Sequence, residues 1–531
     1  MQIIERRTYF SISDYNLRDS SSLESPLLIW EMGVKYPIDK VFLHNENTSI
    51  LTIPRGVGRD YVISRLKADA KYISDEDIID EKDKYVEPRT TTFHLKKDIY
   101  TKDEIQENAI TFLTNELAYQ LMLALDVGFG KTFCSIISAY KLGLVPLVIL
   151  RSNWMDQWVK EFKKYTDLDD EDFLSIVGSD MIERTMKKPA KHQVYIISID
   201  TLVSYLEAGN SLDDFMTHIG VGIKIYDEAH KNFISIMKID QNTNVKHTWY
   251  LTATPGRSSY SENKTYKIVF FDVERFGEHT SRLKQYYNIR ELMYNTEPPY
   301  EEIQICSTPR GFSSIQYASY IFSNKKLVIF YLSLIISYTT KLIEADPDAR
   351  ALVLLDRLDD IAKMKRYLSA RVNYSIGTYC GLIKNYDLRE EELTKQIVLS
   401  TLGSVGVAKN IADLRLILPF ANFSSPIIVR QLMGRLRYLE GKMVYYFNPV
   451  DTGFPAIIGQ SKMRSRELRV RAHTYEEINI SVDDEVKTFI ENDLQACSDI
   501  PNTIPQKRPT KFFQLTHKKR PRTGFNKWRP K

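Results

Sequence analysis

The chain has 531 residues, 43% of them hydrophobic and 26% charged, which leaves room for several globular domains with large cores. Its formal net charge is only +4, but residues 501–531 contain ten Lys and Arg and no acidic residue. Removing these ten from the total of 72 leaves 62 basic against 68 acidic side chains, so the rest of the chain is acidic. We expect this basic, proline-broken tail to be disordered by itself, and the asymmetry indicates a polyanionic partner.

Targeting and metal-binding signals are weak. The N-terminus, MQIIERRTYF, lacks the apolar core of a secretory signal. The longest strongly apolar run, Leu327 to Tyr338, is shorter than the ~20 residues needed to span a bilayer, so we expect a buried helix and no membrane partner. The four cysteines are far apart and form no CxxC or Cys/His cluster, which favours a reducing compartment and argues against structural zinc.

The first segment, to about residue 88, has its own alternating and apolar stretches and ends in the acidic run SDEDIIDEKDKYVEP. We interpret that run as a domain boundary or linker, although such runs are more often solvated faces. Thr101 and Glu104 then form a capping-box pattern, and Ile105, Ala109 and Leu113 fall on one face of the helix that it predicts.

Short apolar runs next alternate with helical stretches, which is typical of parallel strands joined by crossover helices. Five runs make a first series, LMLAL, PLVIL, VYIIS, GIKIY and WYLTA, and four make a second, ALVLL, IVLST, LRLILP and MVYYF. The pattern predicts an α/β protein with two parallel-sheet units in succession and a cleft between them. The expected domains are an N-terminal accessory domain with a possible role in DNA recognition, two α/β units and a C-terminal extension with the basic tail, at residues 1–97, 98–268, 269–465 and 466–531.

The stretch LDVGFGKTFCS, residues 125–135, joins the first of these strands to a helix. That is the context of a phosphate-binding loop, because backbone N–H groups and a helix N-terminus there face an anion. We expect Gly128, Phe129 and Gly130 to form the loop, Lys131 to reach the β- and γ-phosphates, and Thr132 to bind Mg²⁺. A simple glycine turn before a helix is the alternative.

The strand GIKIY runs directly into Asp227, Glu228, Ala229 and His230. Carboxylates at the C-terminal edge of a parallel sheet lie where such sheets bind their ligands. Asp227 is suited to hold Mg²⁺ through water, and Glu228 to orient or deprotonate an attacking water. The alternative is a solvated loop.

Two further motifs follow at the ends of predicted elements. YLTATP places Thr252 and Thr254 after a strand, which is otherwise an ordinary hydroxyl-capped turn. IVRQLMGRLRY places Gln431, Arg435 and Arg437 after the second α/β unit. Arginines of a second domain can reach across a cleft to a γ-phosphate, whereas a lone pair of arginines on a helix is usually surface charge.

In this order and spacing the four motifs resemble those of superfamily 2 helicases and translocases of the DExH type, over roughly residues 98–450. The resemblance implies two tandem RecA-like domains, ATP as substrate and Mg²⁺ as cofactor. It also implies that Gln106 reads adenine. Gln157, whose QW pair is typical of the DNA-translocating branch, Gly381 and Thr401 fall at positions that contact nucleic acid in the family. The N-terminal part, with IPRG at residues 53–56, resembles that of phage-type and poxvirus transcript-release helicases.

Three positions depart from the family pattern. Leu125 replaces the small first residue of the phosphate loop, and Ala408 replaces an acidic residue after Gly406. Tyr438 stands where the last family arginine is expected, with Arg437 one residue early. Arg435 therefore matches the arginine finger by alignment, whereas Arg437 is displaced.

The resemblance implies a DNA helicase or translocase in replication, recombination or transcription, with protein partners from those processes. An RNA helicase and a low-turnover ATP-binding nucleic-acid scaffold are the alternatives. We expect a cytoplasmic protein, in the host cytoplasm if the source is a virus or phage. Two interpretations of the tail stay open: a nucleic-acid tether, and a solubilising or localisation segment.

Overall fold

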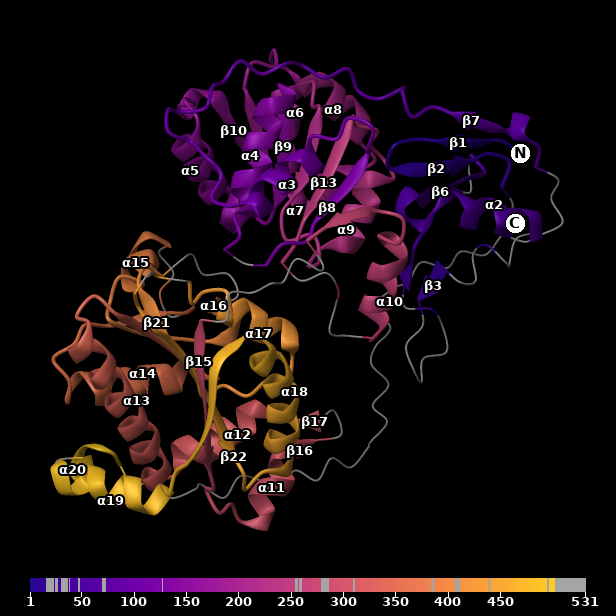
Figure 1. Ribbon diagram of the computed structural model, residues 1–531. Coiled ribbons are helices and arrows are strands. Elements are labelled where there is room, and N and C mark those ends of the chain that lie inside the picture. The colour runs from indigo at the N-terminus through magenta and orange to yellow at the C-terminus, as the bar shows by residue number, and fades with distance from the viewer. Residues whose placement is uncertain are drawn as a thin grey trace.

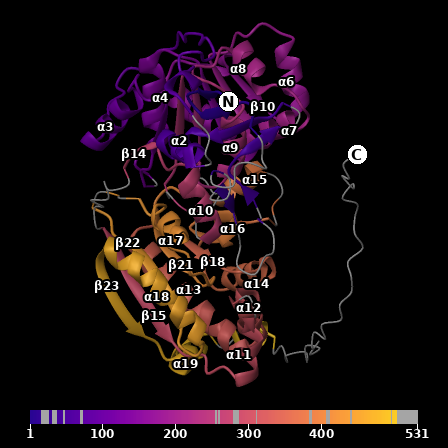
Figure 2. The same ribbon diagram turned by 90° about the vertical axis from the view of Figure 1, so that its right-hand side faces the viewer.

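Three β-sheets follow one another along the chain in the computed structural model (Figure 1). An N-terminal sheet adjoins a first lobe, and the second lobe is stacked against the first (Figure 2). The structure describes residues 1–15, 23, 27–29, 37, 39–45, 48–68, 73–126, 128–253, 256, 260–277, 286–308, 311–381, 383, 386–405, 411–437, 439, 441–493 and 496–501. The basic tail beyond residue 501, Gly406, Ala408 and Tyr438 lie outside the described residues.

The N-terminal sheet has five strands in the order β5-β6-β2-β1-β7. The strands are β1 (Ile3–Glu5), β2 (Tyr9–Ile12), β5 (Leu43–Asn45), β6 (Ile50–Pro54) and β7 (Ile78–Asp80). Helix α2 (Arg59–Ala68) lies between β6 and β7 in the chain, and β3 (Leu28–Ile29) pairs separately with β4 (Asp39–Lys40). The acidic run that we expected to be a linker contains β7, which pairs in parallel with β1. Its two isoleucines supply enough apolar surface to join the sheet, so the run is part of this domain.

The N-terminal sheet is docked on the first lobe by polar contacts. The Thr8 hydroxyl donates to the carbonyl of Asp240 at 2.8 Å, and Arg7 donates to the carbonyl of Lys246 at 2.9 Å. Gly56, the last residue of IPRG, accepts from the Asp272 N–H at 2.7 Å, and a Cβ there would lie 1.9 Å from the Val269 carbonyl oxygen. The IPRG segment therefore lies at the junction between the two domains, and only glycine fits at position 56.

The first lobe is built on a seven-stranded parallel sheet in the order β10-β11-β9-β12-β13-β8-β14. Its strands are β8 (Gln120–Leu123), β9 (Pro146–Leu150), β10 (Phe173–Ile176), β11 (Val194–Ser198), β12 (Ile223–Tyr226), β13 (His247–Leu251) and β14 (Glu274–Phe276). The five strands predicted from the first series of apolar runs are all present, because buried parallel strands are nearly continuous hydrophobic runs.

Helices cover both faces of this sheet, and alternate strand residues enter two separate cores. One face packs against α3 (Glu104–Leu113), α4 (Lys131–Leu142) and α5 (Met155–Tyr165). The other packs against α6 (Ser179–Met186), α7 (Ile199–Glu207), α8 (Leu212–Ile219), α9 (Phe233–Asp240) and α10 (Tyr260–Val269), and its core continues into the N-terminal domain. The accessory domain and the first lobe therefore share one hydrophobic core.

Lys224 lies within the central strand β12 and is fully buried on that second face. Its ammonium donates to Asp240 Oδ1 and to Thr243 Oγ1, both at 2.6 Å. Tyr226 and Tyr250 donate to the same carboxylate at 2.8 and 2.6 Å. A buried charge is tolerated only when it is paired and hydrogen-bonded, and this network satisfies both conditions.

The second lobe also has a seven-stranded parallel sheet, in the order β19-β20-β18-β21-β22-β15-β23. Its strands are β15 (Tyr287–Tyr294), β18 (Arg350–Leu354), β19 (Ile376–Tyr379), β20 (Ile397–Ser400), β21 (Leu414–Pro419), β22 (Val444–Asp451) and β23 (Ala472–Asn479), and β16 (Ser307–Thr308) pairs with β17 (Gly311–Phe312) outside the sheet. Two tandem RecA-like parallel sheets and an N-terminal domain are thus confirmed.

Helices flank the second sheet as well. One face packs against α11 (Tyr300–Cys306), α12 (Ser314–Ser323), α13 (Lys325–Ala345), α14 (Leu358–Ser369) and α19 (Val482–Asn492). The other packs against α17 (Pro426–Met433) and α18 (Pro455–Arg471). The remaining short helices are α15 (Tyr386–Glu392), α16 (Leu402–Val405) and α20 (Ala496–Asp499). In both ribbon views α15 and α16 lie toward the first lobe (Figures 1 and 2).

Helix α13 is longer than the apolar run that predicted it. It has 21 residues, so length and composition would suffice to cross a membrane, and our argument from a short run was wrong. Its most apolar window is 67% buried against the second sheet and neighbouring helices. We interpret it as a core helix, as expected.

The lobes extend beyond the boundaries expected from the sequence. Strand β14 belongs to the first sheet, which therefore reaches Phe276 rather than residue 268. Strand β23 belongs to the second sheet and reaches Asn479 rather than residue 465. On the N-terminal side, the Arg89 N–H donates to the Gly220 carbonyl of the first lobe at 2.8 Å, ahead of the boundary at residue 97.

Candidate active site in the interlobe cleft

The loop between β8 and α4 has the geometry of an anion-binding turn. Gly128 and Gly130 both have left-handed backbones, with φ of 90° and 86°. Lys131 is the first residue of α4, and its ammonium donates to the carbonyls of Leu125 and Asp126 at 2.8 and 3.3 Å. Leu125 therefore contributes through its carbonyl, which any side chain would leave in place.

Helix α3 holds the phosphate loop in place through a side-chain hydrogen bond. Gln106 is buried and donates from Nε2 to the Phe129 carbonyl at 3.1 Å, and a Cβ on Gly130 would lie 2.6 Å from that nitrogen. The helix is capped by Asp103, whose carboxylate accepts from the Gln106 N–H at 3.0 Å. The predicted capping box at Thr101 and Glu104 is wrong, because the helix begins only at Glu104.

Asp227 follows β12 and is held by two donors. Its Oδ1 accepts from the Glu228 N–H and its Oδ2 accepts from the Trp158 indole N–H, both at 2.9 Å. Burial and, to a smaller extent, the neighbouring Glu228 carboxylate raise the pKa of Asp227 to about 6, although Trp158 and Lys131 act in the opposite direction. A divalent cation suits such a carboxylate, since it would compensate for the lost solvation.

Glu228 has a left-handed backbone, with φ of 51°, which is uncommon for a residue with a side chain. Burial opposes its ionisation, but nearby His230, Lys231, Lys131 and Arg435 lower its pKa. His230 lies 3.2 Å from the Glu228 carboxylate, and its Nδ1 is 2.9 Å from the Thr252 hydroxyl. Glu228 is therefore kept anionic among cations from both lobes.

The second lobe brings its predicted arginines to this cleft. Burial lowers the pKa of Arg435 to about 10, whereas Tyr379 and Glu228 raise it. Gly434 is close to the phosphate loop, since a Cβ on Gly128 would lie 4.0 Å from its carbonyl oxygen. Arg437 is exposed, and its charge acts on Lys164 of the first lobe. Gln431 is half-buried on α17.

An ion pair joins the lobes beside the loop. Arg471, at the end of α18, lies 3.3 Å from the Asp126 carboxylate, and both side chains are largely buried. Arg471 also contacts Glu467 at 2.8 Å, and Glu467 accepts two hydrogen bonds from Arg430 at 2.8 and 3.0 Å. A continuous chain of charges thus runs from helix α17 to the phosphate loop.

The residues expected to contact nucleic acid lie on the surfaces of both lobes. Gln157 is exposed on α5. Gly381 and Thr401 follow the C-terminal ends of the adjacent strands β19 and β20, and the Thr401 hydroxyl caps the next turn by accepting from the Ser404 N–H at 3.3 Å. Among the described residues no group of three His, Cys, Asp or Glu side chains could hold a metal ion.

Two contacts in this site join residues that the sequence patterns did not connect. Trp158, next to Gln157, donates a hydrogen bond from its indole N–H to the Asp227 carboxylate. The Lys231 ammonium lies 4.8 Å from the centre of the Trp154 ring, and this contact links the loop after β12 to the turn after β9. The tryptophan of the QW pair could have been found, because a large buried aromatic with an N–H usually has an acceptor.

Residues 99–257 match the family model of the type III restriction enzyme, res subunit. The chain carries a superfamily 2 helicase-type ATPase domain. Enzymes of this class hydrolyse ATP and act on DNA or RNA. The narrower likeness to phage-type and poxvirus helicases stays a prediction. A comparison with curated proteins finds no match.

The chain is similar to several solved structures, and the first of the three described next shares its fold. The ATP-dependent type ISP restriction-modification enzyme LlaBIII, bound to DNA, is 14% identical with a TM-score of 0.51, over 75% of this chain and 33% of its own. Dbp5 of S. cerevisiae, bound to RNA and ADP BeF3, is 13% identical with a TM-score of 0.48, over 73% and 93%. The Hef helicase domain of Pyrococcus furiosus is 15% identical with a TM-score of 0.44, over 70% and 99%.

Proposed function

We propose that the protein is an ATP-driven motor that moves along or unwinds DNA. The observation that carries this proposal is the convergence of Lys131, Glu228 and Arg435, from two lobes, on one cleft. A phosphate loop, a buried carboxylate and a cation from the opposite lobe are the groups that phosphoryl transfer to water requires. Because one of them comes from the second lobe, hydrolysis is coupled to the relative position of the lobes.

The first lobe would hold the nucleotide. Backbone N–H groups of residues 128–130 and the N-terminus of α4 face the phosphates, and Lys131 neutralises their charge. Thr132 and Asp227 supply the hydroxyl and carboxylate oxygens that suit Mg²⁺, which when bound neutralises phosphate charge. Gln106, which donates to the Phe129 carbonyl of the loop, would read the adenine edge.

Glu228 would orient the attacking water and accept its proton. The cations around it keep it ionised at neutral pH, which a base requires. Arg435 would stabilise charge that develops on the transferred phosphoryl group, with Gln431 nearby on helix α17, which ends at Met433. Arg437 would contribute only if the lobes close further, since its side chain is exposed.

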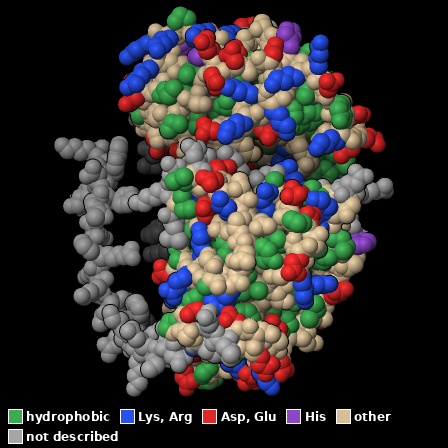
Figure 3. Space-filling view, turned by 90° about the vertical axis from the view of Figure 1, so that its left-hand side faces the viewer, with side chains coloured by type: hydrophobic (Ala, Val, Ile, Leu, Met, Phe, Trp, Pro, Cys, Tyr) green, Lys and Arg blue, Asp and Glu red, His purple; other side chains and the backbone are tan. Residues whose placement is uncertain are grey.

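Nucleic acid would be gripped through its backbone by both lobes, at Gln157 on the first and at Gly381 and Thr401 on the second. Such contacts carry no sequence information, which suits a motor. On the face shown in Figure 3, basic and acidic side chains are interspersed over both lobes rather than gathered by sign. This distribution favours a grip by a few placed residues over a broad electrostatic surface.

Two observations support DNA as the track. The matched family model describes a restriction-enzyme subunit, and restriction enzymes act on DNA. The QW pair is built into the active site through the bond from Trp158 to Asp227. We place the activity in replication, recombination or transcription in the cytoplasm, with protein partners from those processes.

The decisive experiment is an ATPase assay with four stimulators: single-stranded DNA, duplex DNA, branched DNA and RNA. We expect DNA to stimulate hydrolysis more than RNA does. Stimulation by RNA alone would contradict a DNA track and favour an RNA helicase. If ATP binds but no nucleic acid accelerates turnover, the protein is an ATP-binding scaffold.

A further inference from the structure

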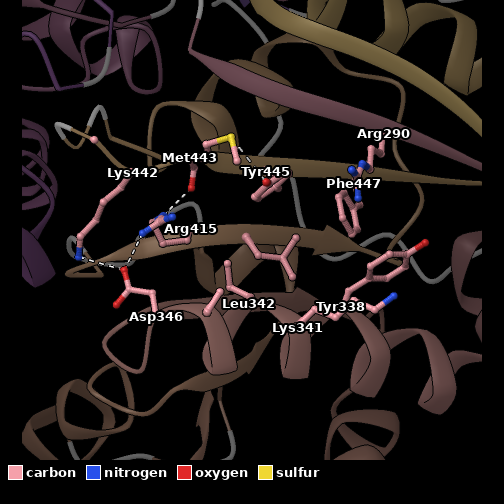
Figure 4. A pocket seen from close by; sticks show the side chains of 13 residues that line it. Arg290, Tyr338, Lys341, Leu342, Asp346, Arg415, Lys442, Met443, Tyr445 and Phe447 are labelled. Atoms are coloured by element: carbon pink, nitrogen blue, oxygen red, sulfur yellow. Dashed lines mark hydrogen bonds and ion pairs between the residues drawn. The ribbon is translucent and has the colours of Figure 1, made fainter.

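The second lobe contains an open pocket of about 380 Å³ between α13 and the strands β21 and β22 (Figure 4). Its floor is apolar, because Leu342, Leu416 and Phe447 are buried there. Cationic side chains lie around it, namely Arg290, Lys341, Arg415 and Lys442. The volume is sufficient for one large side chain and its neighbours, since ligand pockets begin at roughly 300 Å³.

The charges of this pocket are unbalanced. Asp346 is the one carboxylate of its lining and pairs with Arg415 at 2.8 Å and with Lys442 at 3.1 Å, and Lys442 also pairs with Asp413, outside the lining, at 3.5 Å. Arg290 pairs with Glu476 at 3.2 Å, outside the pocket. For Lys341, an exposed residue of α13, the described part of the chain provides no ion pair within 4.0 Å. The pocket therefore favours an anionic occupant.

Its aromatic rings form a socket rather than a flat platform. Tyr338 and Phe447 meet edge to face, with centroids 4.4 Å apart and planes at 75°, and Tyr445 meets Phe447 at 68°. The Arg290 guanidinium lies 5.6 Å and 5.7 Å from the Tyr445 and Phe447 rings. Bases of single-stranded nucleic acid stack on exposed flat ring faces, whereas a concave socket takes an inserted side chain.

The pocket also lies away from the expected nucleic-acid contacts. Arg415 is near the N-terminal end of β21, and Met443 directly precedes β22. Gly381 and Thr401 follow the C-terminal ends of β19 and β20. Because all seven strands are parallel, the pocket lies toward the N-terminal ends of the strands and the expected nucleic-acid contacts lie at their C-terminal ends. An occupant of the pocket could bind while the motor holds nucleic acid.

We propose that this pocket docks an acidic segment of a partner protein that carries one aromatic or large aliphatic side chain. The apolar side chain fills the floor over Leu342 and Leu416, and carboxylates on either side of it meet Lys341 and Arg290. The chain's own tail does not fit, since residues 501–531 have ten basic and no acidic side chains. This inference rests on the pocket alone and not on the ATPase assignment.

A binding assay with the full chain tests this directly. The probe is a fluorescein-labelled peptide, Glu-Asp-Glu-Phe-Asp-Glu-Asp, measured by anisotropy. We expect saturable binding that Lys341→Glu weakens at least ~10-fold, because a rim charge of the wrong sign repels the peptide. Lys462→Glu, an equal charge reversal at an exposed position of α18 on the other face of the sheet, should leave it unchanged. Replacing the peptide's Phe by Ala, or its acids by amides, should weaken binding similarly.

Three results would overturn the proposal. These are absence of peptide binding, equal weakening by Lys341→Glu and Lys462→Glu, and displacement of the peptide by single-stranded oligonucleotide, which would make the pocket a nucleic-acid site. Methyl NMR locates the contact independently, since bound peptide should shift the methyl resonances of Leu342 and Leu416. Unchanged ATP hydrolysis by Lys341→Glu would show that the variant is folded.

Discussion

Glu228 combines an uncommon backbone conformation with a carboxylate surrounded by cations of both lobes. Glu228→Gln keeps the shape of the side chain but removes its capacity to accept a proton. We expect ATP to bind nearly as well and hydrolysis to fall at least ~100-fold, within the range of general-base effects. Single-turnover hydrolysis and nucleotide binding measure the two separately. Glu207→Gln, at an exposed residue of α7, is the control, and wild-type turnover by Glu228→Gln with DNA present would refute the assignment.

The two arginines after α17 differ in environment although they are two residues apart. Arg435 interacts electrostatically with Glu228, whereas Arg437 is exposed near Lys164. We therefore expect Arg435→Ala to abolish turnover with little loss of nucleotide binding, because a finger acts on charge that develops during transfer. Arg437→Ala should impair turnover only partly. Steady-state ATPase rates at saturating DNA decide between them, and a reversed order would make Arg437 the finger.

Sequence patterns pointed to the carboxylates and the lysine of the candidate site because those residues lie at fixed offsets from a strand end. They could not show what contacts them. The bond from Trp158 to Asp227 joins positions 69 apart in the sequence, and the pair between Asp126 and Arg471 joins positions 345 apart. No local periodicity encodes such contacts, since they depend on how whole elements pack.

The same distinction applies at the scale of elements. All nine strands predicted as continuous apolar runs are present, because central parallel strands are buried on both faces. In the two large sheets, strands β10, β14, β15, β19 and β23 were not predicted, and each is at or next to an edge of its sheet. In β23, AHTYEEIN, five of the eight residues are exposed, so its sequence is polar and resembles a loop. The charge of Lys224 within the buried strand β12 is compensated by Asp240, 16 residues away at the end of α9.

The first turn of helix α14 contains a poorly compensated charge. Asp360 is fully buried, and its carboxylate has no hydrogen-bond donor among the described residues. Arg357 is 3.8 Å away, too far for a hydrogen bond. Burial raises the pKa of Asp360 to about 6, with Arg357 and Lys363 acting in the opposite direction.

This environment predicts a pH-dependent gain from Asp360→Asn. The folded-state pKa is above the unfolded value, so the stabilisation from this carboxyl is present below about pH 4 and is lost as the pH rises through about 6. The amide does not ionise, so the variant should be more stable at about pH 7.5, by at most about 3 kcal/mol, and should gain less at about pH 5. Thermal unfolding midpoints at both pH values measure this. Asp359→Asn, at an exposed neighbour, should show no such difference, and an equal gain at both pH values would contradict the argument.

At the scale of the whole molecule, the lobes are joined by the charge chain from Arg430 through Glu467 and Arg471 to Asp126. Its first residue precedes Gln431 on α17, and its last lies in the phosphate loop. Surface ion pairs are worth little, but here Arg471 is 8% and Asp126 21% exposed, so solvent screens the pair less. This series of ion pairs therefore connects the phosphate loop directly to the second lobe.

Arg471→Ala should accordingly loosen the junction. Without its guanidinium the buried Asp126 loses its partner in the second lobe, and the lobes should separate more often. We expect a larger radius of gyration in X-ray scattering and an ATP concentration for half-maximal turnover raised about 5-fold or more, equivalent to roughly 1 kcal/mol of interlobe coupling. Arg469→Ala is a matched control, because Arg469 lies on the same last turn of α18 but is 58% exposed and pairs with Glu477 within its own lobe. Identical scattering and identical ATP dependence for the two variants would show that Asp126 and Arg471 meet without holding the lobes together.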